Sequence, residues 1–175
     1  YYLVASSNDD SDAKVYVSKS STLTDQGEKV MVMDMTGKQR RIFAPELFWL
    51  DDEDGGHWYI YYCADVLDFA GNYPETAAKY QAYSESAPHM ACCLRSKTDD
   101  PQGEYEDIGP LYCGENGVIR DSNDFTVMKY KDSLVGMWGT TGICCYARMD
   151  SPMSITEDRK KLGCGELDEG PRALI

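Results

Sequence analysis

The stretch 45–65, PELFWLDDEDGGHWYIYYCAD, contains the pattern that decides the fold. An apolar run is followed by an acidic turn with two glycines and then by a second run rich in aromatic residues. Two such runs joined by a short Gly-containing turn predict a β-hairpin. A loop then leads to 89–109, HMACCLRSKTDDPQGEYEDIG, which supplies the outer strands. We therefore expect residues 45–109 to form one four-stranded antiparallel unit.

The same order of strands recurs in residues 124–155, as DFTVMKY, the turn KD, SLVGMWG, the turn TTG and ICCYARMDSPMSI. At the front, YYLVASS (1–7) and KVYVSKSSTL (14–23) resemble the second and third strands of a unit whose first strand is absent. Units of this kind, repeated about an axis, are typical of propeller blades. The sequence predicts an all-β fold, a β-propeller of four-stranded antiparallel blades, with an incomplete arc of about three blades in this chain.

Residues 1–175 read as one domain, because no linker or low-complexity segment divides them. Propellers typically close with four to eight blades. We therefore expect this partial propeller to be truncated at both ends and its open arc to expose strand edges, which favours aggregation. An insertion at 66–88 interrupts the unit at 45–109, and its PETAAKYQAY portion is expected to form a short helix or a solvated loop.

The charge balance restricts the partners. The chain has 30 acidic and 17 basic residues, and its net charge is −13 at pH 7. A field of that sign repels nucleic acid, anionic lipid and acidic polysaccharides, so a neutral partner fits best. The sequence has no run of about eighteen apolar residues that could span a membrane. Nothing in the composition fixes the oligomeric state.

The seven cysteines lie mostly inside apolar runs and lack metal-ligand spacing. We interpret them as small core residues, and we assign no metal site. An odd count and adjacent pairs such as Cys92–Cys93 favour a reducing or anaerobic setting over a disulfide framework. The compartment stays open between the cytoplasm and secretion by an anaerobic microbe.

Several stretches resemble the family 43 glycoside hydrolases, five-bladed propellers that remove arabinofuranosyl or xylosyl units from plant polysaccharides. The similarity lies in IFAPELFWL (42–50), HWYIYYCAD (57–65), HMACCLRSKTDDPQGEYEDIGPL (89–111), DFTVMKYKDSLVGMWG (124–139), YARMDSPMSITEDR (146–159) and DEGPRAL (168–174). Each motif is weak alone, but their order and spacing together are specific. The resemblance implies an inverting glycosidase acting on neutral plant hemicellulose, with an α-L-arabinofuranoside favoured over a β-D-xyloside.

Two catalytic carboxylates follow from this resemblance. Glu169 corresponds to the general acid, which must be protonated near neutral pH and therefore needs a raised pKa. Asp124 corresponds to the residue that orients that acid and tunes its pKa. No residue matches the general base, which the family places before the first strand of the first blade, so we expect this fragment alone to be nearly inactive.

The resemblance also implies a substrate-binding set. Glu46 stands where the family places a carboxylate near the sugar, although a salt bridge at the strand edge fits as well. Phe43 replaces the usual Trp and can still form an aromatic wall. Arg172 replaces a small or apolar residue and is expected to pair with a carboxylate in the funnel, and Phe125 replaces a Gly. No cofactor is implied, although relatives often hold calcium on the propeller axis, with a His that would lie beyond Ile175.

Other aromatic and histidine residues have ordinary structural interpretations. Trp49, Trp58 and Trp138 lie in apolar strand runs and are expected in the core. His57 follows an acidic turn and is expected to be solvated. His89 matches a His in some relatives, but a simple role at the start of a strand fits equally well.

Alternative functions remain open to different degrees. A sugar-binding propeller without catalysis would explain the missing base. Fructosidases and sialidases of related fold are disfavoured, because the first carry a Glu-Cys-Pro acid motif and the second need an arginine cluster. A cysteine nucleophile is disfavoured too, because neither His57 nor His89 stands near a cysteine in a recognisable motif.

Overall fold

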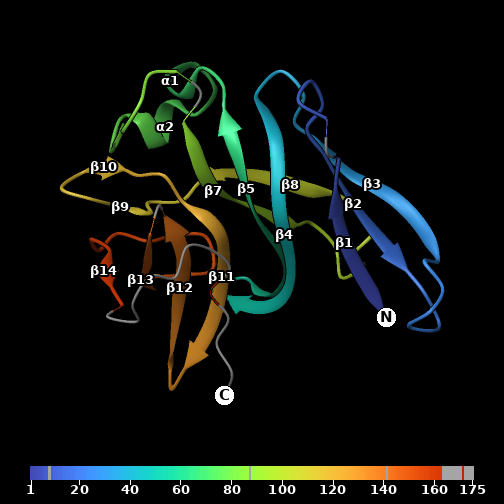
Figure 1. Ribbon diagram of the computed structural model, residues 1–175. Coiled ribbons are helices and arrows are strands. Elements are labelled where there is room, and N and C mark those ends of the chain that lie inside the picture. The colour runs from blue at the N-terminus through green and yellow to red at the C-terminus, as the bar shows by residue number, and fades with distance from the viewer. Residues whose placement is uncertain (8, 87, 141, 163–170, 172–175) are drawn as a thin grey trace.

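The computed structural model describes residues 1–7, 9–86, 88–140, 142–162 and 171. Three antiparallel sheets stand side by side in an open arc, and none of them closes on itself (Figure 1). Their strand orders are β1-β2-β3, β4-β5-β7-β8 and β11-β12-β13-β14. The fold predicted from the sequence is thus confirmed as all-β, with four-stranded antiparallel blades of a partial propeller.

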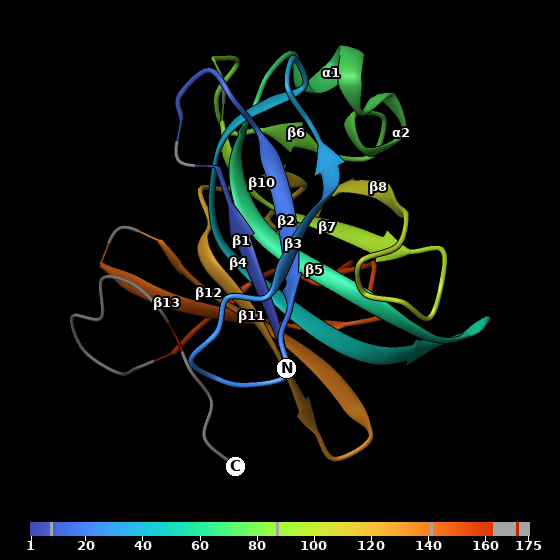
Figure 2. The same ribbon diagram turned by 90° about the vertical axis from the view of Figure 1, so that its right-hand side faces the viewer.

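The first sheet contains β1 (Tyr2–Ser6), β2 (Lys14–Lys19) and β3 (Glu28–Asp34). It has three strands, as expected for a unit that lacks one. Alternation along β2 buries Val15 and Val17, while β1 lies against β4 of the second sheet. Figure 2 shows this sheet facing the viewer, with β4 and β5 behind it.

The second sheet contains β4 (Gln39–Asp52), β5 (Gly55–Val66), β7 (His89–Ser96) and β8 (Tyr105–Pro110). The predicted hairpin forms, with Asp52 paired to Gly55 across the turn. From Tyr59 onward every residue of β5 is buried. A strand covered on both faces needs a continuous apolar run, and residues 59–64 of β5 supply one.

The third sheet contains β11 (Asn123–Tyr130), β12 (Ser133–Thr140), β13 (Ile143–Met149) and β14 (Lys160–Lys161). The turns between its first three strands lie where the sequence predicts them. The second and third sheets share an aromatic core in which the Tyr61 ring lies 5.8 Å from Phe48 and 5.4 Å from Phe125. The Tyr61 hydroxyl also donates a 2.7 Å hydrogen bond to the Pro152 carbonyl, so the two blades are joined by both packing and polar contact.

The insertion forms two short helices, α1 (Phe69–Asn72) and α2 (Pro74–Ala77), followed by β6 (Gln81–Ala82). The helical alternative predicted for this segment is therefore confirmed for its first turn. β6 pairs in parallel with β10 (Val118–Ile119), which pairs with β9 (Gly114–Glu115). Tyr80 stacks on Tyr112 at 4.2 Å, and this contact fixes the insertion against the segment that leads into β11.

The burial of individual residues corrects two expectations. His57 was expected to be solvated, but it lies in β5 with its side chain 19% exposed and bonded to Ser96 and Arg95. Trp138 is fully buried, as predicted, but Trp49 is 45% exposed and packs edge-on against Trp58 at the surface. All the cysteines that the structure describes are buried, as expected: Cys63, Cys92, Cys93, Cys113, Cys144 and Cys145. Within the described ranges, no helix has the length and apolar character needed to cross a bilayer.

Candidate functional site

The first strands of the second and third sheets, β4 and β11, lie beside each other and are both irregular at corresponding places. The register of β4 shifts on either side of Phe43, and that of β11 shifts between Asn123 and Thr126. Arg41, Ala44 and Asp124 have positive φ angles of 52°, 45° and 49°. Positive φ costs a non-glycine residue roughly 1–3 kcal/mol and is concentrated at functional sites. We therefore expect a functional site beside the irregular parts of β4 and β11.

A cavity of about 360 Å³ opens beside these irregular parts of β4 and β11. It is lined by Arg41, Phe43, His89, Asp121, Asn123 and Asp124. The structure therefore brings together Phe43 and Asp124, two residues that the sequence nominated separately. Phe43 is 45% exposed, and its ring centroid lies 5.8 Å from that of His89. The lining of the cavity thus combines an aromatic ring with the carboxylates of Asp121 and Asp124.

The buried carboxylate of Asp65 holds two side chains of the cavity lining. The side chain of Asp65, at the end of β5, is only 1% exposed. It accepts hydrogen bonds from Arg41 Nε at 2.8 Å and Nη2 at 2.5 Å, and from His89 Nδ1 at 2.9 Å. Burial opposes ionisation of Asp65, but the bonds from His89 and Arg41 outweigh it and the pKa is lowered. Asp65 is therefore a fixed negative charge bonded to two residues of the cavity lining.

Further residues missed by the sequence analysis come from the insertion and from the segment before β11. The Tyr83 hydroxyl accepts a bond from the His89 backbone N–H at 3.1 Å and donates to Asp121 Oδ1 at 3.4 Å. Tyr83 thereby links two residues of the cavity wall. The polar RDSN run at 120–123 was the available signal for Asp121, whereas Tyr83 lies in a segment with no recognisable motif.

Glu46 is placed further along β4, where its Oε2 accepts a 2.7 Å hydrogen bond from Thr126 Oγ1 of β11. It is half-buried, and this bond joins the second and third sheets. Its predicted contact with a sugar stays a prediction. Glu169 and Arg172, the predicted general acid and substrate-binding residue, lie outside the described residues, so their placement also stays a prediction.

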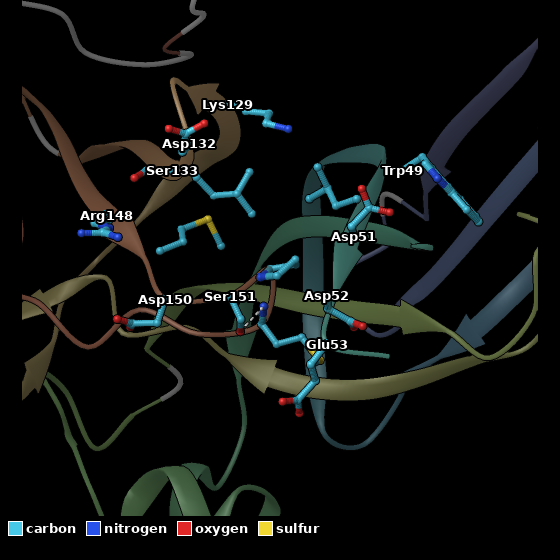
Figure 3. Close-up of a pocket in the computed structure, with 15 residues that line it drawn as sticks. Trp49, Asp51, Asp52, Glu53, Lys129, Asp132, Ser133, Arg148, Asp150 and Ser151 are labelled. Carbon is cyan, nitrogen blue, oxygen red and sulfur yellow. Dashed lines mark hydrogen bonds between the residues drawn. The ribbon is translucent and has the colours of Figure 1, made fainter. Parts of the chain in front are cut away.

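A larger cleft of about 690 Å³ lies at the other end of β4 and β11, between their turns (Figure 3). Its rim carries both signs of charge, with Lys129 and Asp132 on one side and Asp51 and Glu53 on another. The two strands are regular here, and none of the predicted site residues lines this cleft. The smaller cavity is therefore the better candidate despite its size.

Metal ligation has no support among the residues that the structure describes. They contain no group of three or more His, Cys, Asp or Glu side chains placed to hold an ion. His89 is instead held by a carboxylate and lies against an aromatic ring. The chemistry available at the cavity is hydrogen bonding, proton transfer and aromatic packing.

Comparisons with known proteins identify the fold. No protein-family model matches the sequence, and no curated protein has significant sequence similarity to it. The crystal structure of an α-L-arabinofuranosidase from Lactobacillus brevis superposes with a TM-score of 0.65 at 19% sequence identity. The match covers 93% of this chain and 49% of that one, so the chain spans about half the length of the matched structure. The chain therefore has a glycoside-hydrolase-like propeller fold.

Proposed function

We propose that this chain is part of the catalytic propeller of an inverting glycoside hydrolase that removes α-L-arabinofuranosyl units from neutral plant hemicellulose. β-D-Xylosides are the second choice of substrate. The observation that carries the proposal is the cavity where Asp124, in a left-handed conformation, faces the same space as Phe43. The likeness of the fold to an arabinofuranosidase supports it further.

The roles follow from the chemistry of inversion. One carboxylic acid protonates the leaving oxygen while a carboxylate activates water on the opposite face of the sugar, with the two groups about 6.5–9.5 Å apart. We assign the acid role to Glu169 and the orienting role to Asp124. Phe43 would pack on the apolar face of the sugar, with Glu46 and Arg172 as further contacts. No residue of this chain matches the base motif, so we assign the activity to the full-length gene product.

Hydrolysis of two kinds of substrate by the full-length gene product tests this proposal. We expect Glu169→Gln to reduce hydrolysis of natural linkages strongly and to spare aryl arabinofuranosides with good leaving groups, because those depart without a proton. Asp124→Asn should reduce activity on both, because a disturbed acid is misplaced for proton transfer. An equal loss on both substrates in Glu169→Gln would contradict the acid role, and an unaffected variant would remove it.

A sugar-binding propeller without catalysis is the second candidate, and the lack of a residue matching the base favours it. In such a protein the carboxylates would only accept hydrogen bonds from hydroxyls. If the full-length gene product binds an arabinose-containing polymer but hydrolyses none of its linkages, this second candidate is correct.

A further inference from the structure

Both carboxylate oxygens of the buried Asp65 are used to hold side chains of the cavity wall. Oδ1 accepts from His89 Nδ1, and Oδ2 accepts from Nε and Nη2 of Arg41. Arg40 Nε adds a 3.3 Å bond to the same Oδ2. Because a carboxylate with several donors fixes each of them in direction, the orientation of Arg41 and His89 depends on this one residue.

The polar groups that remain on these two side chains differ in kind. His89 donates from Nδ1 to Asp65, so in the neutral ring Nε2 is an acceptor. Arg41 uses Nε and Nη2 on Asp65, which leaves the N–H groups of Nη1 as donors. Both residues line the cavity, and the Arg41 side chain is 46% exposed. The wall therefore offers one acceptor and one donor group close to each other.

This combination selects a hydroxyl group over a charged group. A hydroxyl accepts from Arg41 and donates to His89 in the same position. A carboxylate has no proton for Nε2, and it would also share the cavity with the carboxylates of Asp121 and Asp124. A cation would meet Arg41. The exposed ring of Phe43 beside His89 adds an apolar surface for the C–H groups of a sugar.

We propose that Asp65 is a positioning residue that aims Arg41 and His89 at a hydroxyl of a neutral sugar and so excludes acidic sugars from the cavity. The substrate class rests on the function proposed above, whereas the positioning role itself does not. Neither Arg41 nor Asp65 carries a sequence signal for this role, because Asp65 simply ends the aromatic run of β5.

Asp65→Asn in the full-length gene product is the test, because the amide keeps the shape but turns an N–H toward one of the two donors. We expect KM for an aryl α-L-arabinofuranoside to rise about tenfold while kcat changes little, since the lost contacts are binding contacts. Asp52→Asn is the matched control. Asp52 is also 1% exposed and also paired with an arginine, Arg95, but it lies at the far end of the same sheet. The control should lose similar stability and keep its KM.

Direct binding separates this inference from the proposed reaction. Saturation-transfer NMR with L-arabinose and with D-galacturonic acid requires no hydrolysis. Binding of arabinose alone by the wild type, lost in Asp65→Asn and kept in Asp52→Asn, supports the positioning role even if no substrate is cleaved. Equal weakening in both variants overturns it, and so does wild-type binding of the acidic sugar or of neither sugar. Cleavage of aryl arabinofuranosides with unchanged KM in Asp65→Asn would uphold the reaction and reject the inference.

Discussion

The second sheet buries two aspartates at its opposite ends, and each is neutralised by a different arginine. Asp65 pairs with Arg41, and Asp52 pairs with Arg95 at 2.8 Å. Removing one partner of a buried ion pair is costly, typically 3–5 kcal/mol, because the other charge remains buried alone. The environment of Asp52 also contains the Tyr59 hydroxyl, which donates to the same oxygen as Arg95. These two carboxylates therefore make stability sensitive to acid.

The pH dependence of Asp52 can be predicted with its sign. Burial would raise its pKa, but bonds from Tyr59, the Asp54 backbone and Arg95 lower it from 3.8 to about 2. A lowered native pKa adds stability above the unfolded value, and this stability is lost as pH falls through the native value. We expect the difference in unfolding free energy between the wild type and Asp52→Asn to shrink between pH 4 and pH 2. Urea unfolding at each pH measures it, and a constant difference would contradict the assignment.

At the scale of elements, the third sheet depends on a glycine beneath an aromatic ring. A Cβ on Gly136 of β12 would lie 2.7 Å from Phe125 Cζ and 3.4 Å from Ile155 Cδ1. The ring of Phe125 also packs against Tyr61 of the second sheet, so it has little room to retreat. The absent side chain at this position is what allows the two blades to approach.

We therefore expect Gly136→Ala to destabilise the protein by about 1–3 kcal/mol through overpacking. The double variant Gly136→Ala with Phe125→Leu should cost less than the sum of the single changes, because the smaller side chain leaves space for the added methyl. Thermal or urea unfolding of the wild type, the two single variants and the double variant measures this double-mutant cycle. Additive costs would show that the ring and the methyl do not meet.

Much of this element structure was predictable from local patterns. The alternation of apolar residues and the Gly-containing turns located the hairpins of the second and third sheets, and Phe43 and Asp124 were nominated in advance. The cluster of Arg41, Asp65 and His89 was not, because it joins the beginning of β4, the end of β5 and the beginning of β7. His57 was wrongly expected to be solvated, since its contacts to Ser96 and Arg95 also come from a distant strand. Long-range pairing leaves no local periodicity to detect.

At the scale of the whole molecule, the open arc leaves apolar side chains at one end unburied. Tyr1, just before β1, is exposed, and so are Tyr2 and Leu3 of β1 and Met31 of β3, with Leu3 exposed by 60%. The strong negative charge opposes association at low salt, and screening weakens that opposition as ionic strength rises. Apolar contact and charge repulsion therefore compete in deciding whether the chains stay separate.

We expect the chain to self-associate at high concentration, and more strongly at 0.5 M than at 0.05 M salt. Raising the salt shortens the distance over which the negatively charged surfaces repel each other. Leu3→Lys should reduce this association, because a charged residue at an exposed strand discourages pairing. Sedimentation velocity over a concentration series measures it. Association that is stronger at low salt would indicate attraction between opposite charges instead.

The rate at which buried thiols react with an alkylating reagent reports how often each blade opens. Burial raises the pKa of Cys92, Cys93 and Cys113 well above the ordinary value, so a shielded thiol at these positions is a poor nucleophile. Alkylation must then wait until the surrounding strands separate. Because Cys63, Cys92 and Cys93 belong to the second sheet and Cys145 to the third, peptide-resolved labelling rates record the two openings independently. Equal rates would mean that the arc opens as one cooperative body, and unequal rates would rank its blades by their local free energy of opening.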